Sequence, residues 1–244
     1  MWDDLQALRK LASTLFGVSL LLLLFGAVHY AVHLPVFALH AVRLTAPPQR
    51  VDAAQIEDIV RNGVRGNFFT VDLESTRKTF EKLPWVRKVS VRRHFPWQLE
   101  VELEEQVALA KWNDDELVNT HGEVFAAECE QALPKFIGEA GTAAEVTQMY
   151  QVFGKQLAPL KQNVAQISLS PRRAWQLRLD NGMVLELGRE QAQERLARFV
   201  AVYPYSLPNM GRTVSYVDLR YRNGFAAYLP GGIAKGQAGL EQKS

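Results

Sequence analysis

A long stretch without charged residues near the start of the chain is the feature that most restricts its fold. No Asp, Glu, Lys or Arg occurs from Leu11 to Val42, and the centre of this stretch reads LFGVSLLLLLFGAV. A helix that crosses a membrane needs about 20 apolar residues. The stretch therefore predicts a single transmembrane helix over residues 11–33.

A cleaved signal peptide is the alternative interpretation of such a stretch. Its apolar region is typically about 7–15 residues long, which is shorter than the one found here, and no convincing cleavage site follows. Arg9 and Lys10 precede the apolar stretch, and positively charged flanks stay on the cytoplasmic side. We therefore expect an uncleaved anchor in a bacterial inner membrane. Residues 1–10 would form a cytoplasmic tail, and the bulk of the chain would lie on the periplasmic side.

The overall composition is that of a folded protein with room for one or two domains. The 244 residues are 48% hydrophobic and carry a formal net charge of +2, which excludes a disordered chain and does not favour nucleic acid as a partner. The single cysteine, Cys129, excludes an intrachain disulfide.

The segment that follows the apolar stretch predicts a small α+β domain over residues 37–105. Asp52 and Asp72 are placed as helix N-caps, and the last strand alternates apolar residues with glutamates. The glutamates from Glu100 to Glu105 are expected to form ion pairs with Arg87, Arg92 and Arg93 rather than a metal or catalytic site. The predicted order is strand, helix, helix, strand, strand, over residues 37–44, 53–61, 73–83, 85–94 and 98–105.

The motifs in this segment resemble those of a known family. The sequence FFTVDLESTRKTFEKLPWVRKVSVRRHFPWQLEVELEE is similar to the POTRA domain of the FtsQ/DivIB cell-division proteins. The matching positions are Gly66, Phe68, Phe69, Asp72, Leu83, Pro84, Trp85, Val86, Pro96, Leu99, Val101 and Glu105. Phe95 and Trp97 depart from the family's usual residues.

Residues 106–230 predict a mixed α/β domain whose antiparallel sheet ends in an edge strand. Apolar residues at helical spacing predict a helix over residues 143–157, and a second helix is expected near residues 190–202. The hairpin AWQLRLDNGMVLELG is the clearest strand signal. The resemblance to FtsQ extends through this domain, and it is most specific in SYVDLRY. Residues 231–244 are expected to form a flexible tail.

The chain carries no sequence motif of a catalytic or cofactor-binding site. It has no GxSxG, no phosphate-binding glycine loop and no CxxC. His29 and His33 lie four residues apart, but nothing accompanies them that would complete a metal site. We therefore expect no enzyme activity, no cofactor and no small-molecule substrate.

The C-terminal strand pair, VSYVDLRYRNGFAAYLP, would leave an open sheet edge. An open edge is a liability unless a partner occupies it, so we expect another protein to add a strand there. Tyr221 is the candidate anchor, and Arg220 with Arg172 and Arg173 would form a basic rim. The structural alternative is a core strand in which Val217 and Tyr221 are both packed inside.

The resemblance implies a more specific site and function. FtsQ-like proteins are non-catalytic scaffolds of the bacterial division apparatus at the septum, and they bind FtsB, together with FtsL, through the final strand. The positions that match the family's contact residues are Arg172, Arg220, Tyr221, Asn223 and Gly224. A further division partner for the POTRA domain stays open, and so does the alternative of a membrane-anchored extracytoplasmic sensor or ligand-binding protein.

Overall fold

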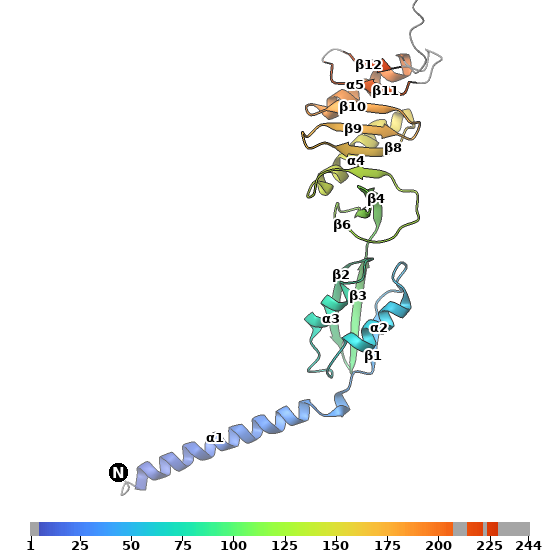
Figure 1. The fold of residues 1–244 in the computed structure, drawn as a ribbon. Coiled ribbons are helices and arrows are strands. Elements are labelled where there is room, and N and C mark those ends of the chain that lie inside the picture. Colours follow the sequence, from blue (N-terminus) through green and yellow to red (C-terminus); the bar gives the residue numbers. More distant parts are fainter. Residues whose placement is uncertain (1–4, 207–213, 222–223, 229–244) are drawn as a thin grey trace, which may run out of the picture. The chain divides into compact units, whose positions relative to one another are not determined.

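The computed structural model describes residues 5–206, 214–221 and 224–228, and the chain divides after Gln106 into two compact units. An α-helix, α1 (Leu5–Val32), begins the first unit (Figure 1). Its residues Leu8–Val32 are long and apolar enough to cross a membrane, and none of them is buried in the protein. The predicted N-terminal apolar helix is therefore present. A short 3₁₀ turn, η1 (Pro35–Phe37), follows it.

The rest of the first unit is a three-stranded sheet with two helices. The elements are β1 (Ala41–Leu44), α2 (Ala53–Gly63), α3 (Leu73–Phe80), β2 (Val86–His94) and β3 (Gln98–Glu105). β3 is central, with β1 parallel to it on one side and β2 antiparallel on the other. The predicted order of strands and helices is confirmed, and its buried core is made of Val51, Ile56, Phe80, Val86, Val89 and Val101.

Local capping sets where the helices of this unit begin and end. The carboxylate of Asp52 accepts a hydrogen bond from the Ala54 N–H, and that of Asp72 accepts from the N–H groups of Glu74 and Ser75. α3 ends at Phe80, three residues before the predicted end at Leu83. Beyond Phe80 the N–H groups of Lys82 and Leu83 bond three residues back, to Thr79 and Phe80, so the chain leaves the α-helical pattern before Pro84.

The acidic strand β3 is only partly explained by the predicted cross-strand ion pairs. Glu104 pairs with Arg87, as expected. Glu105 instead accepts hydrogen bonds from the backbone N–H groups of residues 49–51, at 2.9–3.1 Å. Arg93 donates to the carbonyl oxygens of Phe68 and Val71. For Glu105 and Arg93 the ion-pair prediction is wrong, because their side chains form hydrogen bonds with backbone N–H and carbonyl groups of nearby loops instead.

The second unit contains a nine-stranded sheet. Its strands are β4 (Ala108–Trp112), β5 (Glu116–Asn119), β6 (Val124–Phe125), β7 (Lys135–Ile137), β8 (Val164–Leu169), β9 (Trp175–Leu179), β10 (Val184–Gly188), β11 (Tyr216–Asp218) and β12 (Ala226–Tyr228). Their order across the sheet is β12-β11-β10-β9-β8-β7-β4-β5-β6. The predicted fold class is confirmed, since the second domain combines a sheet with helices.

The sheet is mixed, whereas the sequence analysis predicted an antiparallel sheet, and this detail of the prediction is wrong. Three pairings are parallel: β4 with β7, β7 with β8, and β10 with β11. Two helices, α4 (Ala143–Leu157) and α5 (Ala192–Ser206), lie in sequence between β7 and β8 and between β10 and β11. A helical crossover returns the chain to the same end of the sheet, so the next strand runs parallel. A short 3₁₀ turn, η2 (Ala158–Leu160), follows α4.

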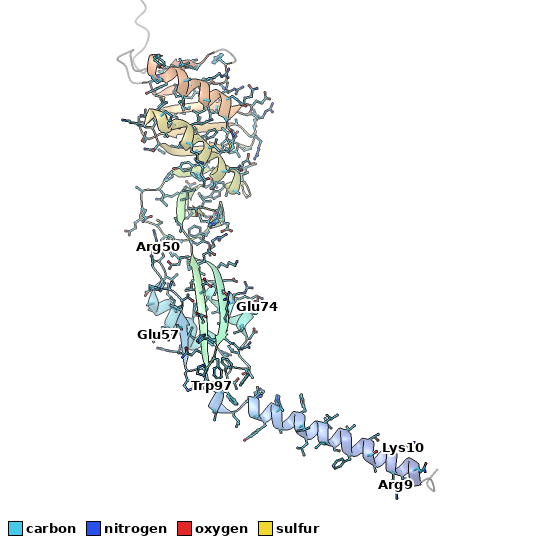
Figure 2. All side chains as sticks on the ribbon, turned by 180° about the vertical axis from the view of Figure 1, so that it is seen from behind. Arg9, Lys10, Arg50, Glu57, Glu74 and Trp97 are labelled. Atoms are coloured by element: carbon cyan, nitrogen blue, oxygen red, sulfur yellow. The ribbon has the colours of Figure 1, made fainter. Side chains whose placement is uncertain are left out.

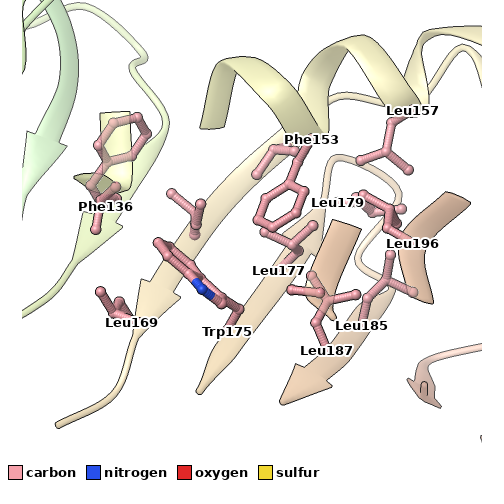
Figure 3. Packing of buried hydrophobic residues seen from close by; sticks show 14 of the residues in the cluster. Phe136, Phe153, Leu157, Leu169, Trp175, Leu177, Leu179, Leu185, Leu187 and Leu196 are labelled. Carbon is pink, nitrogen blue, oxygen red and sulfur yellow. The ribbon is translucent and has the colours of Figure 1, made fainter. Parts of the chain in front are cut away.

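The core of the second unit lies between the sheet and these two helices. Trp175, Leu177 and Leu179 of β9 are buried, whereas the alternating residue Arg178 is exposed. Figure 3 shows the leucines of β9 and β10 facing Phe153 and Leu157 of α4 and Leu196 of α5. Both helices therefore cover one face of the sheet and leave Arg178 on the opposite, open face.

Candidate functional site

The C-terminal strand pair lies at one end of the nine-stranded sheet. β11 is enclosed, because β10 pairs with it in parallel on one side and β12 pairs with it antiparallel on the other. No strand in the described part of the chain pairs with the outer edge of β12. The available edge therefore belongs to β12, and both strands are shorter than the sequence pattern suggested.

Tyr221 lies at the surface, in the connection between β11 and β12. β11 ends at Asp218, so the alternation that buries Val217 and Leu219 does not continue to position 221. The Tyr221 side chain is 57% exposed. The alternative of a simple core strand thus holds for Val217, which is fully buried, and is wrong for Tyr221.

Arg220 is held by an ion pair within its own strand segment. Its Nε and Nη2 atoms donate to the two carboxylate oxygens of Asp218 at 2.9 and 2.7 Å. The hydrogen bond from Arg220 lowers the pKa of Asp218 below its ordinary value, and the same contact raises the pKa of Arg220. Much of the positive charge of Arg220 is therefore already balanced by Asp218.

A shallow depression of about 370 Å³ brings Arg172 and Arg220 together. Arg189 and Arg195 also line it, and the sequence analysis did not identify either of them. Arg195 donates to the carbonyl of Leu187. The complete lining is Arg172, Ala174, Glu186, Gly188, Arg189, Glu190, Arg195 and Arg220, which gives four cations against two carboxylates.

Gly188 is the position that lets these arginines approach each other. Its φ is +74°, and a Cβ atom built there would lie 2.9 Å from Nη1 of Arg195 and 3.0 Å from Cγ of Arg220. A side chain at this position would be strained and would displace both arginines. The signal available in the sequence was the glycine at the end of the β10 pattern, directly before Arg189.

The arginines that line the depression are not the same as those of the predicted basic rim. Arg173 turns away from the depression, because its guanidinium group binds the carboxylate of Glu145 in α4. Arg172 is exposed and forms no ion pair with any residue that the structure describes. Arg172 is therefore the most available of the predicted arginines for a partner's carboxylate.

The remaining predicted residues lie in the connection between β11 and β12. Asn223 is outside the described residues. Gly224 is exposed, and no atom lies within 4 Å of a Cβ atom built there. The neighbouring Phe225 packs edge-to-face on Phe199 of α5, with ring centroids 5.7 Å apart. This contact joins the start of β12 to the helical layer.

An apolar pocket of about 470 Å³ lies between α5 and this connection. Its lining consists of Arg195, Arg198, Phe199, Ala201, Val202, Leu219, Gly224 and Phe225. Small-molecule sites combine an apolar lining with several converging polar groups, and here only the two arginines are polar. Among the described residues no group of three His, Cys, Asp or Glu side chains is placed to hold a metal ion.

Comparison with known proteins gives matches along nearly the whole chain. Residues 110–220 match the family described as cell division protein FtsQ/DivIB, C-terminal, and residues 37–106 match the FtsQ-type POTRA domain. The chain is 45% identical to a cell division protein FtsQ of Nitrosospira multiformis over 232 residues, which cover 93% of this chain and 98% of the relative.

Two further relatives carry the same description. The FtsQ of Burkholderia pseudomallei is 40% identical over 238 residues, covering 95% of each chain. The FtsQ of Escherichia coli is 39% identical over 178 residues, covering 70% of this chain and 64% of the relative. The similarity thus includes both domains and the residues that line the arginine depression.

Proposed function

The chain belongs to the FtsQ/DivIB family of cell division proteins, and we propose that it is a non-catalytic, membrane-anchored scaffold that binds FtsB and FtsL through the outer edge of β12. In this proposal α1 crosses the inner membrane at the division septum, with residues 1–10 in the cytoplasm and both folded domains in the periplasm. Arg172, Arg220, Tyr221, Asn223 and Gly224 are the proposed contact residues for the partner.

The observation that carries the proposal is the unpaired edge of β12, together with an exposed tyrosine in the connection that leads to it. The sheet has no further strand at this edge within the described residues, and Tyr221, between β11 and β12, is 57% exposed. Strand addition supplies main-chain hydrogen bonds to such an edge. Exposed large aromatic residues at a sheet edge are typical of binding hot spots.

The size of β12 indicates that side chains must contribute much of the affinity. β12 has only three residues, and each main-chain hydrogen bond adds a net stabilisation of about 0.5–1.5 kcal/mol. A strand added to β12 alone would therefore bind weakly. An aromatic anchor contributes about 2 kcal/mol or more when it becomes fully buried, which supports a role for Tyr221.

The charge of the depression favours an acidic segment in the partner. Four arginines line the depression. Arg189 pairs with Glu190 and Arg220 with Asp218, which leaves Arg172 and Arg195 as the surplus positive charge, and complementary charges raise the rate of association. Because Arg220 is already bound to Asp218, the free guanidinium group of Arg172 is the better candidate for a direct contact with a partner carboxylate.

The proposal is tested by measuring binding of the FtsB–FtsL complex to the full chain in detergent or lipid. Tyr221→Ala and Arg172→Glu should each weaken binding by about 2 kcal/mol, which corresponds to about a 30-fold rise in Kd. Arg178→Glu is the matched control, because Arg178 is an exposed arginine on the interior strand β9. If the Tyr221→Ala and Arg172→Glu proteins both fold and bind like the parent, the proposal is wrong.

Hydrogen exchange distinguishes strand addition from a contact made by side chains alone. Binding through the edge should slow exchange of the β12 amides, residues 226–228. The opposite edge of the sheet, β6, provides an internal control, since its amides should exchange equally fast with and without the partner. If the partner slowed exchange of the β6 amides and not of the β12 amides, it would bind at the opposite edge of the sheet, and the proposal would be wrong.

A further inference from the structure

Three segments that are far apart in the sequence, and that contain no charged side chain, meet at one end of the first unit. They are residues 32–42, 66–71 and 95–99. Their aromatic side chains form a cluster that we call the aromatic tip, in which Trp97 lies 5.1 Å from Phe37, 5.6 Å from Phe68 and 5.9 Å from Phe95, measured between ring centroids. The tip consists of Phe37, Phe68, Phe69, Phe95 and Trp97.

The aromatic tip lies at the end of the domain where the chain arrives from α1. β1 follows η1 directly and runs parallel to β3, so the start of β3 is at the same end as the start of β1. The His40 N–H donates to the carbonyl of Trp97 at 3.0 Å. Figure 2 shows Trp97 at this end of the domain and Arg50 at the opposite end.

A hydrogen bond also ties the tip to the last turn of α1. The side-chain amide of Asn67 donates to the carbonyl of Val32 at 2.6 Å. The Phe68 N–H donates to the carbonyl of Phe37 at 2.9 Å. The segment of residues 66–71 is therefore held close to the end of the candidate membrane span.

Several apolar side chains at this end are exposed rather than packed into the domain. Phe95 is 74% exposed, Val36 is 68% exposed and Phe69 is 48% exposed. In contrast, the buried core of the unit consists of Ile56, Phe80 and four valines, none of which belongs to the tip. A group of exposed apolar side chains at one place on a small domain indicates a surface that contacts something other than water.

The length of the apolar part of α1 determines where the aromatic tip would lie relative to a lipid bilayer. The 22 residues from Leu11 to Val32 span about 33 Å as an α-helix, which is close to the thickness of about 30 Å for the hydrocarbon core of a bilayer. Val32 would then lie at the boundary of the hydrocarbon core. The headgroup region continues for about 5–8 Å beyond it, and η1 begins only three residues after Val32.

We propose that the aromatic tip is seated in the headgroup region of the outer leaflet, so that the lipid bilayer covers Phe69 and Phe95. The inference rests on the proposed crossing of the membrane by α1. Trp and Tyr concentrate at this depth because each joins an apolar ring to a polar N–H or O–H group, and Trp97 is at the centre of the tip. The exposed rings of Phe69 and Phe95 beside it would be removed from water there. The continuity of the tip with α1 favours lipid over another protein as the occupant. The contact would restrain the domain against the membrane at a second place besides the helix.

The test uses the full chain in vesicles of phosphatidylethanolamine and phosphatidylglycerol, with Cys129 replaced by serine. A spin label is attached at one site at a time, through Phe95→Cys, Gln49→Cys or Leu21→Cys. Collisions of the label with oxygen, which partitions into lipid, are compared with collisions with a water-soluble nickel chelate. Gln49 is the aqueous control, because it is exposed and adjacent to Arg50 at the far end of the domain.

The ratio of oxygen to nickel collisions should be severalfold higher for the label at Phe95 than for the label at Gln49, and lower than at Leu21. Equal ratios at Phe95 and Gln49, with Leu21 in lipid, would overturn this inference and leave the membrane anchor intact. A label at Leu21 that collides freely with the nickel chelate would overturn both this inference and the proposed crossing of the membrane by α1. Loss of collisions with both reagents at Phe95 would show a protein contact and would also refute lipid as the occupant.

Discussion

Replacing Glu105 by alanine should release the segment that leads into α2. The carboxylate of Glu105 accepts hydrogen bonds from three successive backbone N–H groups, those of Gln49, Arg50 and Val51, at 2.9–3.1 Å. Alanine removes the acceptor and leaves these donors to water. The substitution therefore acts on a single, well-defined set of hydrogen bonds between the last residue of β3 and the loop before α2.

The size of the effect follows from the number of donors. A hydrogen bond contributes a net stabilisation of about 0.5–1.5 kcal/mol, and more when the acceptor is charged. The site is partly exposed, so water replaces some of the lost bonds, and we expect the free energy of opening of this loop to fall by about 2 kcal/mol. That change corresponds to about 30-fold faster exchange of the three amide hydrogens.

Hydrogen exchange of peptides that cover residues 46–56 measures the effect directly. Glu102→Ala is the matched control, because Glu102 is an exposed carboxylate on the same strand and no hydrogen bond joins it to this loop. The reasoning would be refuted if the Glu105→Ala and Glu102→Ala proteins exchanged the amides of residues 49–51 at the same corrected rate.

The same carboxylate should make the stability of the first domain depend on pH. Partial burial alone would raise the pKa of Glu105, but the three N–H donors outweigh it and lower the pKa below the ordinary value for glutamate. A lowered pKa means that the stabilisation is complete above the ordinary value, about 4.3, and is lost as the pH falls through the depressed value. Below about pH 4, the Tm of the parent should therefore fall more steeply with decreasing pH than the Tm of the Glu105→Gln protein.

The remaining predictions concern the sheet edge. Gly188→Ala should destabilise the second domain by about 1–2 kcal/mol because of its positive φ, seen as a lower Tm, and it should weaken partner binding by displacing Arg220; normal binding would show that this arginine need not stay in place. Phe225→Ala should lower the free energy of unfolding by about 1–3 kcal/mol through loss of the contact with Phe199, and faster amide exchange in β12 would identify the strand that loosens. Asp218→Asn removes the carboxylate that balances the charge of Arg220, so association with FtsB–FtsL should become faster at low salt, measured by stopped flow, and an unchanged rate would contradict an electrostatic role for the depression.

Much of the fold follows from local sequence patterns. The charge-free stretch after Lys10 specifies a helix, because about 20 apolar residues in succession have few other stable arrangements. Asp52 and Asp72 mark helix starts by accepting hydrogen bonds from N–H groups two or three residues ahead. The alternation in β9 and its burial under two helices follow from the period of two along a strand. These signals act over a few residues, and the sequence alone determined them.

The arrangement of the candidate site was decided by contacts between distant segments. The sequence suggested that Arg172, Arg173 and Arg220 act together, but Arg173 pairs with Glu145 of α4 and leaves the depression. Tyr221 was predicted as a surface anchor with a packed core position as the alternative, and the short length of β11 decided between the two. An arginine side chain can reach any of several carboxylates or carbonyls nearby, and only the tertiary packing decides which one it binds.

The sequence by itself determined the membrane-spanning candidate, the two domains' helices and most of the strands, because hydrophobic periodicity and helix caps are local properties. Only the tertiary structure decided that the sheet is mixed, that β12 rather than β11 forms the outer edge, and that three charge-free segments meet at the aromatic tip. Strand order and the meeting of distant loops depend on which surfaces bury each other, and a one-dimensional pattern carries that information only weakly.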